Sequence, residues 1–343
     1  MRFNFAVHAL AAMTAIAALT GTVSSAMAFK ACQVTDTGGV DDKSFNQTAW
    51  KGVQDAMAQL GVEGMVLESR AETDYEPNIN SLIAQNCDII ITVGFLLGDG
   101  TKAAAEANPN VKFSIVDYAY DPAIPNVLGQ IFATDEAAFL AGYLSAGVSK
   151  TGVVGTFGGI NIPTVTIFMD GFYHGVQYYN QQKGTSVQVL GWDPATKEGL
   201  FTNNFDSLSD GREFAKNLHD EGADIVMPVA GPVGQGSSAL AAELGADMLK
   251  VIGVDVDWYQ TVPEHKSVFL TSVMKRMDTT TFEAIKQAME GTFQGGVVVG
   301  TLASDGVAIA EFHDLDGEVS DELRAELEAI KAGIIDGSIS VKG

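Results

Sequence analysis

The sequence predicts an α/β fold with two doubly wound parallel-sheet lobes. From residue 31, short apolar runs alternate with stretches that have the periodicity of an amphipathic helix, which is the order of a parallel sheet covered by helices. The alternation starts again at about residue 135, so two halves of similar size follow one another. No Pro- or Ser-rich linker separates the halves, and we therefore expect lobes that are joined by short crossings.

The first half begins with the apolar run ACQVT, which predicts a strand. A helix is expected over residues 44–60, because Trp50 and Val53 share one face and Gly61 marks its end. The run CDIIITVG at 87–94 is apolar without a break, as in a strand that is buried on both faces. The first strand covers 31–35, the other strands are expected at 65–69, 112–117 and 126–133, and the other helices at 76–86 and 101–109.

The second half repeats this order. A helix over 163–181 starts at Pro163, whose fixed φ suits a first helical position. The remaining helices are expected at 135–147, 210–222 and 237–245, and the strands at 150–159, 186–192, 224–231 and 250–255. The last part is less regular, with apolar runs at 268–274, 297–304 and 306–312 and helices at 278–290 and 320–335.

Composition limits the class of protein and of partner. With 343 residues, 46% of them apolar, the chain can bury two substantial cores. Its formal net charge of −23 repels nucleic acid and anionic lipid, so we expect neither as a partner. No cluster of Lys or Arg offers a site for a phosphorylated ligand.

The first residues have the pattern of a cleavable signal peptide. Arg2 precedes a long apolar stretch that ends in Ala26-Met27-Ala28. A membrane anchor is the alternative, but Thr, Ser and Gly residues interrupt the stretch before the ~20 apolar residues that span a bilayer. We expect cleavage after Ala28 and export of a soluble chain.

The two cysteines are expected to form a disulfide. Cys32 and Cys87 each open an apolar run, and the thiols would lie at the same sheet edge if these runs are neighbouring parallel strands. Export allows the bond to form and persist. Two unpaired buried thiols are the alternative.

Three apolar runs end in aspartate, at Asp36, Asp117 and Asp255. Ligands of open parallel sheets bind beyond the carboxyl ends of the strands. One such aspartate is as often a helix cap or a turn residue, but three at the same relative place in both halves favour a shared cleft. Carboxylates accept hydrogen bonds from hydroxyl, amine and ring N–H groups, and they repel phosphate. Two further runs, ITVGFLLGDG at 91–100 and MPVAGPVGQG at 227–236, end in glycine-rich turns. Such turns let backbone groups approach a ligand closely.

Three other side chains are candidates for this cleft. Phe45 lies in the loop GGVDDKSFNQ and Phe205 in NNFDSLSDG, both at strand-to-helix turns. Each ring could stack on a flat ligand, or it could be a hydrophobic staple for the helix that follows. Lys275 follows the run VFLTSVM and could pair with a cleft acid or face the solvent.

Signatures of catalysis are lacking in the sequence. The histidines have no metal-ligand spacing, and there is no H-E-x-x-H, C-x-x-C, G-x-S-x-G or Walker motif. The segment DLDGEVSDE resembles a calcium loop for four residues only, and we interpret it as a turn. We expect no enzyme, no cofactor and no bound metal.

Several segments together resemble one family of binding proteins. TDTGGVDDKSFNQTAWKG, DEAAFLAGYLSAGVSKTGVVG, FMDGFYHGV, ADIVMPVAG and GVDVDWYQ with SVMKRMD resemble the BMP family, over nearly the whole mature chain and in the same order. These "basic membrane proteins" are purine-nucleoside-receptor-like substrate-binding proteins of ABC importers. The resemblance implies a type I periplasmic-binding-protein fold, in which a three-crossing hinge joins two lobes around the ligand.

The resemblance also implies a domain division. After a signal peptide at 1–28, residues 29–131 and 256–291 would form the N-terminal lobe. Residues 132–255 and 292–343 would form the C-terminal lobe. Such a protein is expected to be a periplasmic monomer that delivers its ligand to an ABC permease in the inner membrane.

The ligand that the resemblance implies is a purine nucleoside. The base-binding positions of the family are matched by Asp36, Asn46 and Asp117, with Phe45 and Phe205 as stacking rings, and the ribose-binding positions by Gly231, Asp255 and Lys275. Ser44 is expected to cap the helix that follows it. Met227 stands where the family would have another aromatic residue, which is a departure from the pattern.

Two alternatives remain open at this point. Within the same class, the ligand could be a free nucleobase or a neutral sugar-like solute. From another class, the protein could be a secreted nucleoside hydrolase, although such an enzyme would ordinarily gather its aspartates in one loop, whereas here they lie on separate strands.

Overall fold

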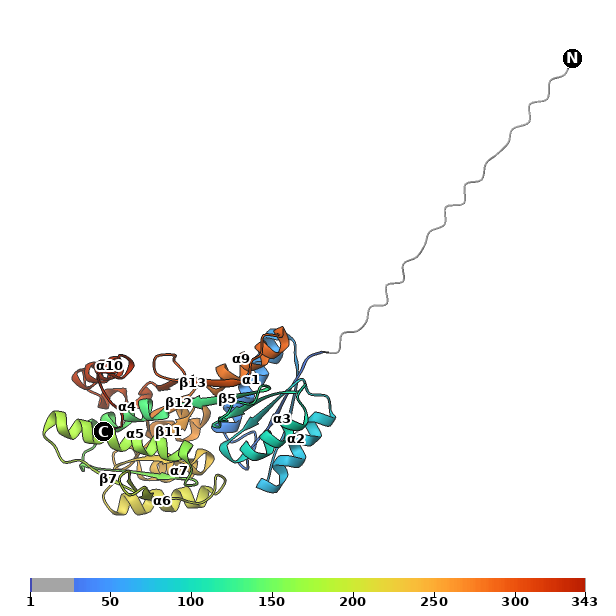
Figure 1. The fold of residues 1–343 in the computed structure, drawn as a ribbon. Helices are drawn as coiled ribbons and strands as arrows, with labels where there is room; N and C mark the ends of the chain where they lie inside the picture. Colours follow the sequence, from blue (N-terminus) through green and yellow to red (C-terminus); the bar gives the residue numbers. More distant parts are fainter. Residues whose placement is uncertain (2–27, 343) are drawn as a thin grey trace.

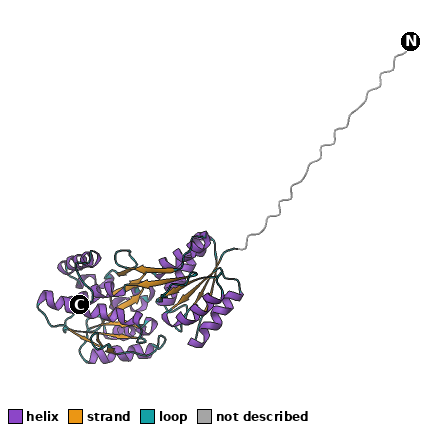
Figure 2. Cartoon of the chain, viewed as in Figure 1, coloured by secondary structure: helices purple, strands orange, loops and turns teal. Residues whose placement is uncertain are grey.

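The computed structural model describes Met1 and residues 28–342. Apart from its two end residues, the signal peptide expected at 1–28 lies outside the described residues. The described chain forms two lobes, each an α/β unit with its own sheet (Figure 1). Helices cover both faces of the strands in each lobe, as the alternation in the sequence predicts (Figure 2).

The first lobe is built on a six-stranded sheet of order β13-β5-β4-β3-β1-β2, in which every pair is parallel. Helices α1 and α9 pack together on one face, and α2 and α3 cover the other (Figure 1). Its strands are β1 Lys30–Val34, β2 Glu63–Leu67, β3 Ile89–Val93, β4 Lys112–Val116, β5 Val127–Phe132 and β13 Gly296–Gly300. Its helices are α1 Phe45–Leu60, α2 Tyr75–Ala84, α3 Gly98–Ala107 and α9 Met277–Glu290.

The second lobe has a six-stranded sheet of order β14-β12-β11-β10-β6-β7, parallel except for β14. Helices α4 and α5 form one layer and α6 and α7 the other, with α10 packed on α4. Its strands are β6 Val153–Gly158, β7 Gln188–Leu190, β10 Ile225–Val229, β11 Lys250–Asp255, β12 Phe269–Lys275 and β14 Val307–Ile309, with a small hairpin of β8 Trp192–Asp193 and β9 Glu198–Gly199. Its helices are α4 Thr134–Val148, α5 Pro163–Lys183, α6 Leu208–Asp220, α7 Gly234–Leu244, α8 Trp258–Thr261 and α10 Asp321–Ile335.

The chain passes between the lobes three times, and the last two crossings differ from the expected positions. β12 pairs with β11 and β14, so residues 269–275 belong to the second sheet and not to the first lobe. β13 pairs with β5, so 296–300 belong to the first sheet. The crossings therefore fall near residues 133, 276 and 301–306. An apolar run does not indicate which of two sheets it joins, and this is why the sequence placed the crossings near 256 and 292.

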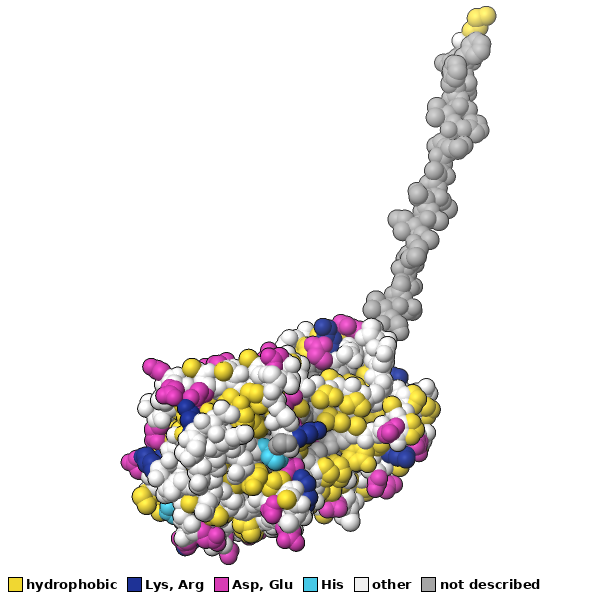
Figure 3. Space-filling view, turned by 60° about the vertical axis from the view of Figure 1, so that its left-hand side comes forward, with side chains coloured by type: hydrophobic (Ala, Val, Ile, Leu, Met, Phe, Trp, Pro, Cys, Tyr) yellow, Lys and Arg dark blue, Asp and Glu magenta, His cyan; other side chains and the backbone are white. Residues whose placement is uncertain are grey.

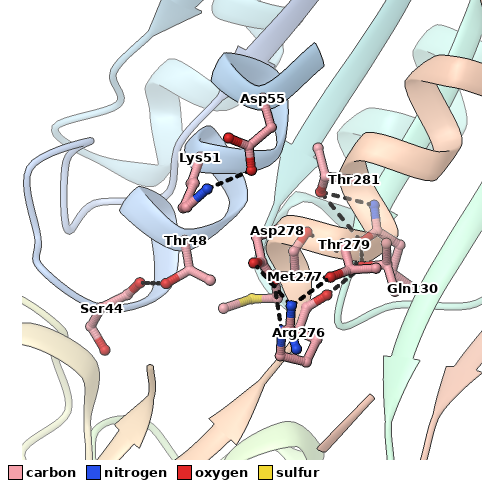
Figure 4. A network of polar contacts seen from close by, with 11 residues as sticks. Ser44, Thr48, Lys51, Asp55, Gln130, Arg276, Met277, Asp278, Thr279 and Thr281 are labelled. Atoms are coloured by element: carbon pink, nitrogen blue, oxygen red, sulfur yellow. Dashed lines mark hydrogen bonds and ion pairs between the residues drawn. The ribbon is translucent and has the colours of Figure 1, made fainter. Parts of the chain in front are cut away.

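The second crossing is held by polar contacts that Figure 4 shows. The Arg276 guanidinium contacts the Asp278 carboxylate at 3.2 Å and the Thr279 hydroxyl at 3.0 Å, at the start of α9. The buried Gln130 amide of β5 bonds to Thr281 in α9. The Arg276 contacts order the turn into α9, and the Gln130 contact ties α9 to β5 of the first lobe.

Cys32 and Cys87 are joined in the structure, at the edge where β1 and β3 run side by side. This is the pairing that the sequence favours. In the part of the chain that the structure describes, no helix is long and apolar enough to cross a bilayer.

Candidate ligand-binding site

A cavity lies between the lobes, at the carboxyl ends of both parallel sheets. It contains about 610 Å³ of empty space, including the part that opens to solvent. The side chains that line it come from both lobes: Asp36, Asp42, Phe45, Phe95, Leu96 and Asp117 from the first, and Ile162, Thr164, Val165, Phe168, Phe205, Val229, Pro232, Val254, Asp255 and Lys275 from the second, with Gly94 and Gly231. The position agrees with the rule that open parallel sheets bind ligands beyond their strand ends.

The wall from the first lobe is formed by the loop after β1 and the turn after β3. Asp36 follows β1, and Phe45 is the first residue of α1. Gly94 follows β3 with φ 120°, a conformation that side chains rarely adopt. A Cβ atom at Gly94 would lie 3.5 Å from Asp36 and 3.6 Å from Phe45, which are ordinary van der Waals contacts. The backbone conformation of this turn, and not a lack of space, therefore favours glycine between the acid and the ring.

The wall from the second lobe is mostly apolar. Phe168 lies in α5, and Phe205 lies in the loop before α6. The Phe205 ring rests on Gly159, where an added Cβ would approach it to 2.3 Å. The glycine turn after β6 thus seats the ring at the cavity.

Lys275 is the one basic residue among the lining residues, against four aspartates. Its ammonium lies 2.7 Å from Asp117 Oδ2 and 3.5 Å from Asp255 Oδ1, and its side chain is 3% exposed. The ammonium also lies 4.7 Å from the centre of the Phe45 ring and 5.5 Å from that of Phe168. Because Lys275 ends β12 and Asp117 follows β4, the contact ties the two lobes together.

Burial and charge act in opposite directions on this group of residues. Burial alone lowers the pKa of the Lys275 ammonium, but the carboxylates of Asp117 and Asp255 outweigh it, so the pKa is raised. Burial raises the pKa of Asp117, although Lys275 opposes the shift. The lysine therefore stays charged and compensates part of the negative charge of the cleft.

Asp36 is oriented by a network behind the cavity. Its Oδ1 accepts hydrogen bonds from Asn46 Nδ2 at 2.6 Å and from the Gly38 N–H at 2.9 Å. Burial raises the pKa of Asp36, and these two donors oppose the shift. Among residues 28–342 no donor bonds to Asp36 Oδ2, so this oxygen is available to an N–H or O–H group of a ligand.

Asn46 is the residue of the expected set that does not line the cavity. Its amide group donates to Asp36 Oδ1 and to Asp42 Oδ2, and its Oδ1 accepts from the Asp36 N–H. Both amide hydrogens are thus used inside the protein. Asn46 orients Asp36 from behind, while the other residues expected to bind ligand come together at the cavity: Asp36, Phe45, Asp117, Phe205, Gly231, Asp255 and Lys275.

Phe168 and Phe95 were not expected from the sequence. Phe95 follows the turn at Gly94, in one of the glycine-rich segments that the sequence indicated. Phe168 lies about one turn into α5, after the turn GINI at 159–162. That turn follows β6, which has the same place in its sheet as β1, so the strand-end rule applied to it would have found the ring. Met227 is fully buried in β10 and is not among the lining residues.

The groups at the cavity can bind a ligand by stacking and by hydrogen bonding. Carboxylate oxygens, one ammonium group and several aromatic rings suit a flat ligand with hydrogen-bond donors. In the described part of the chain, no three His, Cys, Asp or Glu side chains are grouped so that they could hold a metal ion.

Comparisons with known proteins place the chain among substrate-binding proteins, in agreement with a ligand cavity between two lobes. The profile of the family described as "ABC transporter substrate-binding protein PnrA-like" matches residues 29–343. The chain is 32% identical over 329 residues to the "CD4+ T-cell-stimulating antigen" of Listeria monocytogenes, covering 91% of this chain and 88% of that protein. It is also 32% identical over 328 residues to the "ABC transporter nucleoside-binding protein BmpA" of Lactococcus lactis, with 91% and 88% coverage.

A solved structure has the same fold. The solute-binding protein of an ABC transporter system from Aeropyrum pernix K1 superposes with a TM-score of 0.81 at 26% identity, covering 91% of this chain and 92% of that one. Together with the two parallel-sheet lobes, this confirms the expected type I periplasmic-binding-protein fold.

Proposed function

Because the chain belongs to the family of PnrA-like ABC transporter substrate-binding proteins, we propose that its ligand is a purine nucleoside, bound between the lobes and delivered to an ABC permease. The observation that carries the proposal is the pairing of aromatic rings with carboxylates at one cavity. Phe45 and Phe205 offer ring faces from opposite lobes, and Asp36 Oδ2 is open to a donor of the base. A relative is named as nucleoside-binding, which supports the same ligand class.

The charge of the cavity favours a nucleoside over a nucleotide. Asp36, Asp42, Asp117 and Asp255 line it together with a single Lys275. A phosphate group would be brought close to these carboxylates with only one cation to offset their repulsion. A ribose hydroxyl, in contrast, can donate to Asp255 and accept from Lys275.

The proposal includes export to the periplasm. Cleavage after Ala28 would release a chain that starts at Phe29, and the family profile matches from residue 29 onward. The acidic side chains are spread over the visible surface, which would keep the protein monomeric and away from nucleic acid (Figure 3). We propose no catalysis, since the family is one of substrate-binding proteins.

The test is to identify what the protein carries and what it binds. Native mass spectrometry of protein purified without added ligand is expected to show a mass increment of a purine nucleoside. Calorimetric titration should then show binding of guanosine, inosine or adenosine and no binding of guanosine monophosphate. If only ribose or another neutral sugar binds, the nucleoside proposal is wrong. Release of free base from bound nucleoside would instead indicate a hydrolase.

A further inference from the structure

Ser44 occupies the capping position of α1 and yet does not cap the helix. A serine at this position ordinarily accepts a hydrogen bond from a backbone N–H of the first turn. Here its side chain makes no such bond. Its hydroxyl lies 2.9 Å from Asp255 Oδ2 and 3.2 Å from the Val254 carbonyl oxygen, both in the other lobe. In Figure 4 the Ser44 side chain points away from α1. The expectation that Ser44 caps α1 was therefore wrong, because its hydroxyl bonds to the other lobe instead.

Asp42 caps the helix in place of Ser44. Its carboxylate accepts from the backbone N–H groups of Ser44 at 3.0 Å, Asn46 at 2.8 Å and Gln47 at 3.0 Å. These are donors that have no partner inside a helix. With this cap in place, the Ser44 hydroxyl is free to donate elsewhere.

We propose that Ser44 is a positioning residue that completes the ligand site only when the lobes close. Ser44 is fully buried and is not among the residues that line the cavity. Its contact holds Asp255 Oδ2, which leaves Asp255 Oδ1 on the side of Lys275 at 3.5 Å. Asp255 has φ 71°, a conformation that a non-glycine residue keeps only where its surroundings hold it. Because the donor comes from the opposite lobe, Asp255 loses it as soon as the cleft opens.

Two neighbouring contacts bring the same loop against the second lobe. Gln235 Nε2 donates to the Asp42 carbonyl oxygen at 2.8 Å, and Lys43 pairs with Glu264 at 2.7 Å. The Lys43 and Glu264 side chains are 39% and 48% exposed, and such an ion pair contributes little in water. The Ser44 contact is buried and involves a carboxylate, so it is the stronger of these links.

The experiment compares Ser44→Ala with Ser320→Ala. Ser320 is the capping residue of α10, where its hydroxyl does accept from the Leu323 N–H, and it is not among the residues that line the cavity. Calorimetric titration uses guanosine, inosine and adenosine as probes, and this readout rests on the proposed function. Small-angle scattering of the ligand-free proteins measures lobe closure and does not depend on the ligand.

Ser44→Ala is expected to raise the Kd for the bound nucleoside by about ten- to a hundredfold, the effect of losing a hydrogen bond to a charged group. Ser320→Ala should leave the Kd unchanged and lower Tm by about 2 °C, since it removes a cap. In an Asp255→Ala background, Ser44→Ala should change the Kd by less than about twofold, because the residue acts through Asp255. The radius of gyration of ligand-free Ser44→Ala should exceed that of the parent.

The proposal is overturned if Ser44→Ala and the parent have the same Kd, or if Ser44→Ala weakens binding equally with and without Asp255. If the parent binds none of the three nucleosides, the proposed function has failed and the scattering data decide on Ser44 alone. Equal radii of gyration for the parent and Ser44→Ala would then refute its role in closure, and a larger radius for the variant would support it.

Discussion

Asp117 and Asp255 hold equivalent places in the two lobes and face each other across Lys275. Asp117 follows β4 and Asp255 ends β11, and each of these strands is third in the order of its six-stranded sheet. Both residues have left-handed backbones, with φ 66° and 71°. A non-glycine residue in this region costs about 1–3 kcal/mol, which is a strain that clusters at functional sites. The same strain at equivalent positions therefore supports a site that draws on both sheets.

Stacking on Phe45 can be tested against a structural role of the same ring. Phe45→Ala should weaken nucleoside binding by about 1–3 kcal/mol, the range seen when a base loses an aromatic partner. Phe45→Leu is the matched control, because it keeps apolar bulk against the core but removes the ring face. We expect the Leu variant to retain the parent's Tm and still lose affinity. Full affinity in the folded fraction of both variants, with a large loss of Tm in Phe45→Ala, would make the residue a helix staple instead.

The strand-end rule located most of the cavity because it depends on topology alone. A parallel sheet brings all its carboxyl ends to one edge, so an aspartate after an apolar run is placed before any side-chain contact is known. Asp36, Asp117 and Asp255 were found in this way, and their three strands do converge on the cavity. The disulfide followed from the same reasoning, since Cys32 and Cys87 open neighbouring runs.

The features that the sequence did not predict depend on contacts between distant segments. Ser44 has the local pattern of a cap, but its hydroxyl bonds to a residue 211 positions away. Asn46 has a ligand-binding pattern, but its amide donors are used by Asp36 and Asp42. The second and third crossings have no marker in the sequence, because β12 and β13 are apolar runs that either sheet could have accepted. The residues next to each of these features in the sequence do not determine them.

The disulfide is expected to be complete in the mature protein. Thiol titration of the denatured, unreduced chain should find no reactive thiol, because Cys32 and Cys87 are joined. The bond closes a loop across a separation of 55 residues, so Cys32→Ser with Cys87→Ser should lower the free energy of unfolding by up to ~4 kcal/mol. Two reactive thiols per chain would contradict the pairing.

Asp42 predicts a pH dependence of stability. Burial raises the pKa of this carboxyl from 3.8 to about 7, with the backbone N–H groups of Asn46, Gln47 and Ser44 opposing the shift. The folded protein therefore binds this proton more tightly than the unfolded chain does. The resulting stabilisation is fully present below about pH 4 and is lost as pH rises through about 7. Its upper limit is about 4 kcal/mol.

The measurement is chemical unfolding of the parent and of Asp42→Asn from pH 4 to 8. The asparagine variant lacks the titrating group, so the free energy of unfolding of the parent should fall relative to that of Asp42→Asn over this range. Asp41→Asn, in the same loop but exposed, removes an equal formal charge and should follow the parent. A constant difference between parent and Asp42→Asn would show that the carboxyl titrates alike in the folded and unfolded states.

Recognition of the sugar is the last prediction, and it rests on Asp255 and Lys275. Asp255 Oδ1 and the Lys275 ammonium are 3.5 Å apart at the cavity, so a ribose diol could donate to the acid and accept from the lysine. Nucleosides should therefore bind better than their free bases. Asp255→Ala should cost about 2–4 kcal/mol in nucleoside binding, which is tens- to several-hundredfold in Kd, and should scarcely affect a free base.

The contributions of the sugar and of the base to affinity are separated by calorimetric titration of guanosine and guanine against the parent, Asp255→Ala and Asp257→Ala. Asp257 lies two residues further on and pairs with His313 outside the cavity, so its substitution removes an equal charge without touching the lining. It should leave both affinities near those of the parent. If guanine and guanosine bind the parent equally, or if Asp255→Ala weakens the binding of both to the same extent, Asp255 does not bind the ribose. The ligand would then be recognised through its base alone, and a free nucleobase would replace the nucleoside as the proposed cargo.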